Sequence, residues 1–333
     1  MRIGVTYDLR SDYLALGYGD EETAEFDSEI TIAAICGALE SLGHEPIRIG
    51  GVRRLTERLV AGERWDAVFN ICEGLKGVAR EAQVPALLEA YDVPYVFSDP
   101  LTLALALDKG LAKRIVRSCD VPTPDFALIE CADDIANVDL PFPLFLKPVA
   151  EGSGKGVDAK SRVSSRTALA HTAHTLLERF RQPVLAEIFL PGREFTVGII
   201  GTGRDAEVLG VLELFWTDKA SAHGYGYANK AYYEERMTYR LADDRAGADA
   251  ADVALAAWRA LRCRDGGRVD IRFGNDGKAY FLEANPLAGL HPDHSDLVFI
   301  ARFTGLCYRD LIERILSSFM RRRPDLAIAD AVN

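Results

Sequence analysis

The stretch GRVDIRFGNDGKAYFLEAN, residues 267–285, carries the strongest structural signal in this sequence. It predicts two antiparallel strands joined by a tight turn over 274–277. Because side chains alternate between the two faces of a strand, one face of the hairpin collects every second residue of each strand. These residues are Arg268, Asp270, Arg272, Phe281, Glu283 and Asn285. A two-residue turn places Arg268 opposite Glu283, with Asp270 diagonal to it on the same face.

This face gathers a guanidinium (Arg268) and three oxygen-bearing side chains: Asp270, Glu283 and Asn285. Oxygen ligands of this kind suit Mg²⁺, which binds one or two carboxylates together with substrate phosphates. The alternative is a solvated face with an Arg–Glu surface pair, which contributes little to stability. The spacing by itself leaves both interpretations open.

A second signal lies where LFLKP, residues 144–148, runs into VAEGSGKGV, residues 149–157. Glycine lets backbone N–H groups approach an anion closely, and Lys147 and Lys155 add positive charge, so this loop is typical of phosphate binding. The alternative is an ordinary flexible loop. The segment does not fit the P-loop pattern, because Gly156 stands where a hydroxyl should follow Lys155. No Gly-x-Gly-x-x-Gly follows the first predicted strand, so a dinucleotide site is not indicated.

The composition is that of a globular protein, with 333 residues, 48% apolar and 27% charged. The formal net charge of −11 argues against a nucleic-acid or anionic-membrane surface, because both need excess Lys and Arg. No apolar run approaches the roughly 18 residues of a membrane span. The six cysteines form no C-x-x-C pair. We therefore expect a cytoplasmic enzyme with reduced thiols and with no nucleic-acid or membrane partner.

Three stretches of the chain differ in their patterns. Residues 1–98 alternate strand-like and helix-like segments, which predicts a doubly wound parallel sheet. Ser98-Asp99-Pro100 starts a helix that we expect to run over 101–119. Residues 99–183 form a second lobe, which contains the glycine-rich loop. Residues 184–333 are strand-rich and form the third lobe, so the overall class is α/β with two α+β lobes.

Six motifs, in this order and at this spacing, resemble the ATP-grasp superfamily and most closely its D-alanine–D-alanine ligase family. They are Val93-Pro-Tyr-Val-Phe-Ser98, Leu107-Asp-Lys109, Lys147-Pro-x-x-Glu-Gly-Ser-x-x-Gly156, Glu187-Ile-Phe-Leu-Pro-Gly-Arg-Glu-Phe-Thr-Val197, Gly267-Arg-Val-Asp270 and Leu282-Glu-Ala-Asn285. Each motif alone is moderately specific, and the ordered set, over about 67–316, is strongly specific. The resemblance implies an ATP-grasp fold, in which an N-terminal sheet domain precedes two lobes that enclose ATP between antiparallel sheets.

The resemblance also implies a role for each matching residue at the nucleotide. The residues implied are Lys109, Lys147 and Lys230 for the phosphates, Glu151, Gly152, Ser153 and Gly154 for the closing loop, Glu187 and Leu190 for the adenine, and Glu194 for the ribose. Taken singly, each has an ordinary alternative. Lys109 could be a solvated helix lysine, and Glu187 and Glu194 could be strand and turn carboxylates.

For metal binding and chemistry the implied residues lie mostly on the 267–285 hairpin. Three residues would hold two Mg²⁺ ions, with Mn²⁺ as the alternative ion: Asp270, Glu283 and Asn285. Arg268 and the backbone N–H of Gly289 would stabilise the charge of an acyl phosphate and of the tetrahedral species. Ser153 would position the first substrate. The alternative for Gly289 is a glycine that simply ends a loop.

The substrate half departs from the family pattern. The family's N-terminal Gly-Gly segment is missing, and Glu29 becomes the candidate for holding a substrate amino group; its alternative is a first-turn acid favoured by the helix dipole. Cys72-Glu73-Gly74 replaces the family's His-Gly, and Arg80-Glu81 stand near its acidic pair. In a Gly- and Tyr-rich stretch, 217–240, the family's Lys-Tyr becomes Lys230-Ala231. We therefore expect substrates other than two D-alanines.

Together these patterns predict an ATP-dependent ligase. It would activate a small carboxylate, an amino acid or short peptide, as an acyl phosphate and join it to an amine, with release of ADP and phosphate. The alternatives are an ATP-grasp kinase and a non-catalytic ATP-binding protein. The family resemblance favours a homodimer.

Overall fold

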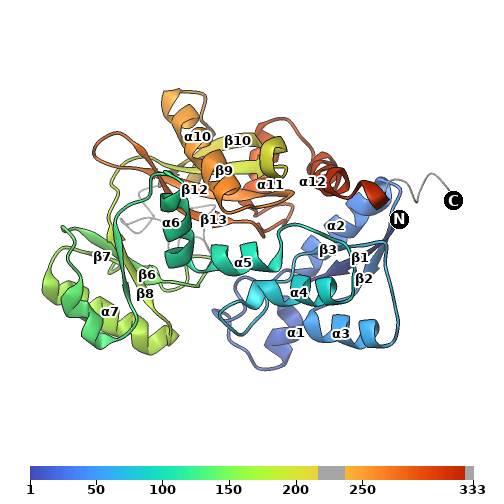
Figure 1. Ribbon diagram of the computed structural model, residues 1–333, viewed down its shortest axis with the longest axis horizontal. Coiled ribbons are helices and arrows are strands. Elements are labelled where there is room, and N and C mark those ends of the chain that lie inside the picture. The colour runs from blue at the N-terminus through green and yellow to red at the C-terminus, as the bar shows by residue number, and fades with distance from the viewer. Residues whose placement is uncertain (217–236, 327–333) are drawn as a thin grey trace.

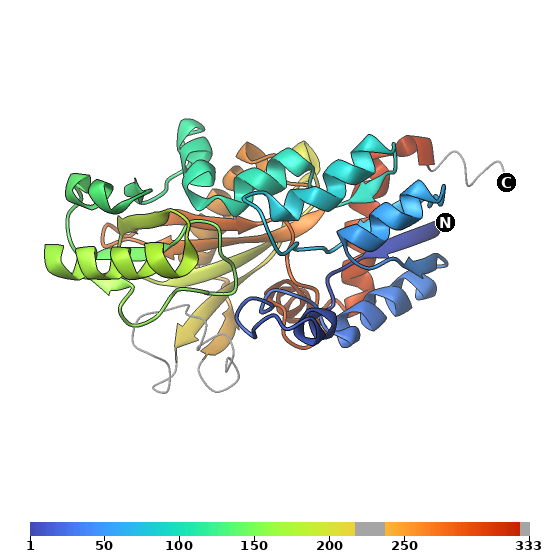
Figure 2. The same ribbon diagram turned by 90° about the horizontal axis from the view of Figure 1, so that it is seen from below.

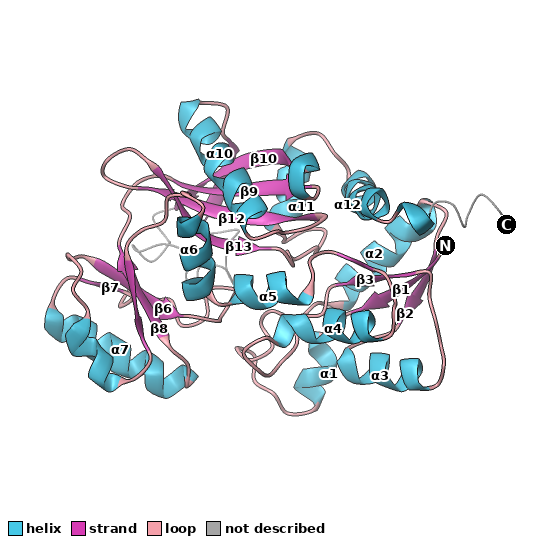
Figure 3. Cartoon of the chain, viewed as in Figure 1, coloured by secondary structure: helices cyan, strands magenta, loops and turns pink. Residues whose placement is uncertain are grey.

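The computed structural model describes residues 1–216 and 237–326. Its described part contains three β-sheets with helices packed on their faces, which confirms the α/β class (Figure 1, Figure 3). The elements of residues 1–98 lie at one end of the molecule, and the sheet of residues 126–188 lies at the other (Figure 2). Among the described helices, none is both long and apolar enough to cross a bilayer.

The N-terminal sheet is parallel, in the order β2-β1-β3-β4, as the sequence predicts. Its strands are β1 (Arg2–Thr6), β2 (Glu45–Arg48), β3 (Ala67–Asn70) and β4 (Tyr95–Val96). Its helices are α1 (Arg10–Ala15), α2 (Glu29–Ser41), α3 (Val52–Val60), α4 (Gln83–Ala90) and the 3-10 helix η1 (Arg80–Ala82). Apolar side chains of β1 and of one face of α2 are fully buried: Ile3, Val5, Ile32, Ile35 and Leu39.

Helices α5 (Pro100–Leu107) and α6 (Lys109–Ser118) lead from this sheet to the next. The sequence predicts one continuous helix here, and that prediction is wrong. Asp108 leaves the helical region with ψ of 98°, and its side chain accepts a hydrogen bond from the N–H of Leu111. Asp108 therefore ends one helix and caps the next.

The second sheet is antiparallel, in the order β5-β8-β6-β7. Its elements are β5 (Phe126–Ile129), η2 (Ala132–Asn137), β6 (Leu144–Pro148), β7 (Arg162–Val163), α7 (Arg166–Phe180) and β8 (Val184–Ile188). One face of α7 is buried against the sheet through Leu169, Ala173 and Leu176. Because β8 pairs with β5 and β6, the expected lobe boundary at 183/184 would cut β8 from its own sheet. We propose a boundary after residue 188 instead.

The third sheet is antiparallel, in the order β11-β10-β9-β12-β13. Its elements are β9 (Glu194–Ile200), η3 (Gly203–Asp205), β10 (Glu207–Trp216), β11 (Met237–Leu241), α10 (Arg245–Ala260), β12 (Gly266–Phe273) and β13 (Ala279–Asn285). Helix α10 packs on this sheet with Trp258 fully buried. The last helices, α11 (Asp296–Phe303) and α12 (Tyr308–Arg322), share a single hydrophobic core with β1 and α2.

A fully buried carboxylate, Asp265, joins the third sheet to the N-terminal unit. It accepts the backbone N–H of Phe97 at 2.7 Å, the hydroxyl of Ser318 at 3.1 Å and the guanidinium of Arg322 at 2.6 Å. The charge is thus satisfied by several donors, as a buried carboxylate requires. These bonds hold helix α12 and the segment after β4 against the start of β12.

Candidate functional site

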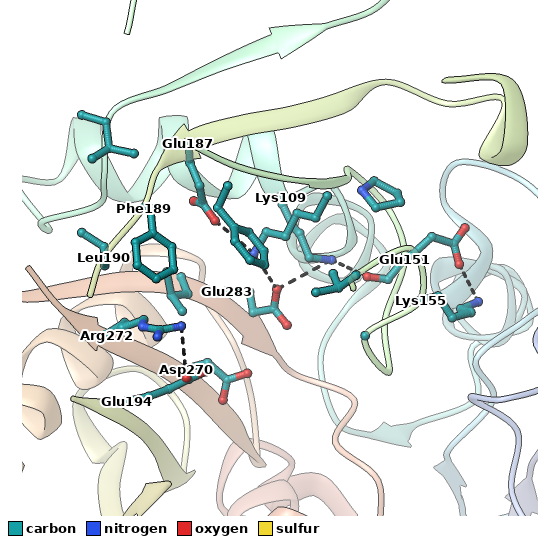
Figure 4. Close-up of a pocket in the computed structure, with 17 residues that line it drawn as sticks. Lys109, Glu151, Lys155, Glu187, Phe189, Leu190, Glu194, Asp270, Arg272 and Glu283 are labelled. Carbon is teal, nitrogen blue, oxygen red and sulfur yellow. Dashed lines mark hydrogen bonds and ion pairs between the residues drawn. The ribbon is translucent and has the colours of Figure 1, made fainter. Parts of the chain in front are cut away.

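Two neighbouring cavities open among the three sheets. The first is lined by side chains of the second and third sheets, among them Lys147, Glu187, Phe189, Leu190, Glu194, Asp270, Arg272 and Glu283 (Figure 4). The second reaches toward the N-terminal sheet and shares Lys109, Glu151 and Glu283 with the first. Because these residues border both cavities, the two form one continuous site.

The β12–β13 hairpin supplies one wall. Asp270 lies opposite Glu283 and Arg268 opposite Asn285, and the register then shifts so that Leu282 is the extra residue of a bulge. The predicted pairing of Arg268 with Glu283 is wrong by two residues, because the turn is one residue longer than predicted and the bulge adds another. The four polar side chains nevertheless all line the site.

The same bulge turns Phe281 away from the site. Phe281 pairs with Ile271, and both side chains are fully buried in the core beneath α10. Strict alternation predicts that Phe281 lies on the same face as Glu283. The extra residue, Leu282, reverses the facing of the β13 residues that precede it, so Phe281 lies on the opposite face. Arg272 keeps its predicted face and lines the first cavity.

Two lysines from separate elements meet Glu283 at the junction of the cavities. Lys147 Nζ, on β6, lies 3.3 Å from Glu283 Oε2, and Lys109 Nζ, on α6, lies 3.8 Å from it. Lys109 also donates to the carbonyl oxygen of Glu151 at 2.6 Å (Figure 4). Burial alone would raise the pKa of Glu283, but the two ammonium groups outweigh it and hold that pKa well below its usual range. The junction thus presents two fixed cations.

Asp270 faces Glu283 from the neighbouring strand. It accepts hydrogen bonds from Arg268, whose Nε also lies 3.5 Å from Asp296. Burial raises the pKa of Asp270, the Glu283 carboxylate raises it further, and Arg268 opposes both. With the amide of Asn285, whose Nδ2 is 3.5 Å from Asp270, these two facing carboxylates form an oxygen donor set. Such a set fits a divalent cation.

A second cluster of buried charges lies beneath the first cavity. Lys113, fully buried on α6, lies 2.8 Å from Glu187, which also lies 3.3 Å from Lys147. Lys113 donates a further hydrogen bond to the hydroxyl of Thr123 at 3.1 Å. Burial lowers the pKa of Lys113 to about 8, against the opposing charge of Glu187. The motifs do not single out Lys113; the available signal is its position four residues after Lys109, on the same helix face.

We expect Lys113→Met to lower the free energy of unfolding by about 3–5 kcal/mol, because it leaves the buried Glu187 with Lys147 as its only ion-pair partner among the described residues. Urea denaturation followed by circular dichroism measures the change. Lys278→Met, in the exposed hairpin turn, is the matched control and should stay within about 0.5 kcal/mol of the parent. A loss below about 1 kcal/mol for Lys113→Met would contradict a structural role for this pair.

The outer end of the first cavity holds Glu194 and Arg272, which pair at 3.2 Å across β9 and β12. The Arg272 guanidinium also lies over the ring of Phe189, 5.2 Å from its centroid. Glu194 Oε2, the oxygen of this ion pair, and Arg272 Nε are both buried without a hydrogen bond in the described part of the chain. A buried polar atom without a hydrogen bond is costly, so this end is suited to a ligand that supplies hydroxyl groups.

The glycine-rich loop after β6 is tied to the N-terminal unit by a buried carboxylate. Glu25 accepts the N–H of Gly152 at 2.6 Å and pairs with Arg80 at 3.0 Å and with Lys155 at 3.1 Å. Arg80 also donates to the carbonyl oxygen of Ala150 at 2.8 Å. Burial would raise the pKa of Glu25, but the two cations outweigh it and lower that pKa. The motifs gave no sign of Glu25, because its partners are distant in the sequence.

The structure brings together nearly all the predicted site residues that it describes. Those that line one cavity or the other are Lys109, Lys147, Glu151, Gly152, Ser153, Gly154, Glu187, Leu190, Glu194, Arg268, Asp270, Glu283, Asn285 and Gly289. Lys230 lies outside the described residues. The remaining residue, Glu29, stands apart from the site.

The side chain of Glu29 is 60% exposed and pairs with Arg48 at 2.5 Å. It lines neither cavity, whereas Asp27, two residues earlier, lines the second. The structure therefore does not support the expected contact of Glu29 with a substrate. The physical reason is the rotation of the helix: Ser28 and Thr31 line the second cavity from one face of the first turn of α2, and Glu29 lies off that face and points to solvent.

The amino-acid sequence is similar to that of D-alanine–D-alanine ligases. The family model for the C-terminus of D-ala D-ala ligases matches residues 115–317. A D-alanine–D-alanine ligase of Bordetella petrii is 34% identical over 272 residues, which cover 80% of this chain and 79% of that protein. An uncharacterized protein of Sinorhizobium fredii is 30% identical, with 87% of each chain covered.

Solved structures show the same architecture. The D-alanine–D-alanine ligase of Bacillus anthracis complexed with ATP aligns with a TM-score of 0.73 at 21% identity, covering 98% of this chain and 99% of that one. A D-Ala:D-Ser ligase of Enterococcus faecalis aligns with a TM-score of 0.71 at 18% identity, covering 96% and 99%. At these identities the likeness concerns the fold, and it confirms the predicted ATP-grasp architecture.

Proposed function

This protein belongs to the D-alanine–D-alanine ligase family, and from that premise we propose that it joins the carboxyl group of one amino acid or small peptide to the amino group of another. It is an ATP-dependent ligase that forms an amide bond. The observation that supports the proposal most directly is the shared border of the two cavities. Lys109, Glu151 and Glu283 face both, so a nucleotide in the first would meet an acid in the second.

We assign the first cavity to ATP. The buried Lys113–Glu187–Lys147 cluster would lie at the adenine, together with the backbone near Leu190. Glu194 has a buried carboxylate oxygen that lacks a hydrogen-bond partner within the described chain, which suits the ribose hydroxyls. The glycine-rich loop lies at the junction, where backbone N–H groups would cover the phosphates.

The metal of this family is a divalent cation, and we propose Mg²⁺, as two ions, with Mn²⁺ as the alternative. Asp270, Glu283 and Asn285 would hold it, because they form the oxygen donor set at the junction. When bound, the ion would supply positive charge against the phosphates.

In the first step, a carboxylate oxygen of the acid attacks the γ-phosphorus of ATP, and ADP leaves with the electrons of the broken P–O bond. Lys109 and Lys147 are positioned to offset the negative charge of the transferring group, which is the main contribution that proteins make to phosphoryl transfer. Glu283 keeps both ammonium groups at the junction. The product of this step is an acyl phosphate.

In the second step, the amine nitrogen attacks the acyl carbon, phosphate leaves with the C–O bond electrons, and the nitrogen loses a proton. Arg268 and the backbone N–H of Gly289 line the second cavity and would stabilise the oxyanion. Arg268 is held by Asp270 and by Asp296, so it needs little reorganisation during the reaction.

The test is product analysis. We expect ADP and phosphate, without AMP, only when both an acid and an amine are present. Hydroxylamine in place of the amine should give a hydroxamate, because it captures the acyl phosphate. Amine-independent formation of a phosphorylated alcohol would instead assign a kinase. Tight Mg-ATP binding with no turnover in any mixture would assign a non-catalytic protein.

A further inference from the structure

The wall of the second cavity that faces the N-terminal sheet carries three carboxylates, Asp27, Glu73 and Glu81. Within the described part of the chain none of them makes an ion pair within 4.0 Å. Burial raises the pKa of Asp27 and of Glu81 to about 7, and that of Glu73 well above its usual range. Neighbouring carboxylates, including Glu25, add to the rise for Glu73 and Glu81, and Arg80 opposes it. Among the described residues, this wall therefore has carboxylates without an ion-pair partner.

The lysines and arginines around this cavity already have partners. Arg80 and Lys155 pair with Glu25, and Lys155 pairs also with Glu151 at 2.5 Å. The other three have acids of their own: Lys109 pairs with Glu283, Arg268 with Asp270, and Arg10 with Asp20. Two histidines, His291 and His294, also line this cavity, and their rings stack with centroids 4.3 Å apart. Burial lowers the pKa of His291, and the neighbouring His294 lowers it further.

A metal ion does not account for the three acids. Among the described residues no group of three or more His, Cys, Asp or Glu side chains is arranged to hold one. A carboxylate that is partly desolvated beside others gains most from an ammonium or guanidinium placed against it. A single carboxylate is enough for the α-ammonium group of an amino acid, and this wall supplies more than one. The additional carboxylates indicate that the ligand carries a second positive group.

We propose that the second cavity binds an amino acid or small peptide that carries an additional cationic group, an ammonium or guanidinium, held by Glu73 and Glu81. This inference rests on the proposed ligase function and specifies its substrate class. It also accounts for Glu73 standing where the family has histidine, because the exchange replaces a near-neutral ring with an acid. A substrate with an uncharged side chain would leave Glu73 and Glu81 without an ion-pair partner among the described residues.

The decisive comparison is between ligands of matched size, lysine against norleucine and ornithine against norvaline, in both chiral forms. ADP release with saturating Mg-ATP and a panel of amines should give a KM roughly 10- to 100-fold lower for the cationic member of each pair, the size of a charge-assisted interaction. Equal KM values, or a preference for the uncharged member, would overturn the proposal.

Two variants test the residues. Glu73→Gln and Glu81→Gln should each raise the KM for the cationic ligand roughly 10-fold or more, with kcat and the KM for ATP changed far less. Glu40→Gln, at an exposed position of α2, is the matched control. A variant that leaves the cationic KM unchanged would exclude that residue from cation binding.

Failure of the ligase function would be recognised separately. If no amino acid supports ADP release, calorimetric titration of lysine and norleucine into the protein with a non-hydrolysable ATP analogue still measures the preference for charge. Tighter binding of lysine, weakened by Glu73→Gln, would support the cation site without the ligase. Equal or absent binding of both would refute it.

Discussion

Asp270→Asn and Glu283→Gln each lower the rate of ADP release by about three orders of magnitude or more, which is the largest effect we expect from any single substitution. Both remove an anionic oxygen donor from the facing pair on β12 and β13. Loss of one carboxylate weakens the hold on a divalent cation, whose charge contributes several kcal/mol to stabilising the transferring phosphoryl group. Each 1.36 kcal/mol, roughly, corresponds to a factor of ten in rate.

The measurement is coupled-assay turnover at saturating Mg-ATP, with the melting temperature recorded for each variant. Asp276→Asn lies in the turn of the same hairpin, 43% exposed at its side chain, and serves as the matched control with near-parent activity. Raised Mg²⁺ should restore part of the activity of Glu283→Gln. Turnover within tenfold of the parent in both site variants would contradict the assigned metal site.

Arg268→Met lowers kcat by about 100- to 1,000-fold while the KM for ATP stays within a few-fold of the parent. The side chain lines the second cavity and meets charge that develops as the acyl group reacts, so its loss affects the transition state more than nucleotide binding. Its removal also frees Asp270 from a hydrogen-bonded partner. Steady-state kinetics with varied ATP and varied acid separates the two effects.

Arg268→Lys tests how far the charge alone suffices, and we expect partial recovery because an ammonium cannot reproduce the guanidinium fork. Arg245→Met removes an arginine whose side chain is 88% exposed on α10 and serves as the control. A variant in which the KM for ATP rises while kcat holds would instead place Arg268 at the nucleotide.

The β12–β13 hairpin shows which structural features the alternation of side chains can predict and which it cannot. The pattern of residues 267–285 predicts two paired strands with acids and Arg268 on one face, and the structure has both. It does not predict that the turn is one residue longer or that Leu282 forms a bulge, and together these two changes move the partner of Arg268 from Glu283 to Asn285. A bulge adds one residue without any change of composition, so it leaves no periodic trace in the sequence.

In the N-terminal segment, the sequence pattern selected a residue that does not line the site. A first-turn acid on a predicted helix made Glu29 the candidate, yet the structure turns it to solvent. The cavity is instead faced by Asp27, and the glycine-rich loop is held by Glu25. Which side chain of an irregular segment points inward depends on the elements packed against it. No local rule fixes that direction.

The features that could be predicted from the amino-acid sequence alone have a short-range cause. The strand alternation, the capping side chain of Asp99 and the glycine-rich loop after Lys147 all follow from residues within one turn or strand. The ordered motifs also predicted the family and the ATP-grasp fold. These predictions hold because backbone geometry repeats over a few residues.

Which distant charged residues contact one another depends on how the elements pack. The Lys113–Glu187 pair, the Glu25 tie to the glycine-rich loop and the Asp265 junction each join residues far apart in the chain. The same is true of the core that α12 shares with α2. Such contacts arise when separately formed elements pack and leave a few buried charges that must find partners. They have no period along the sequence, so only the packed structure specifies them.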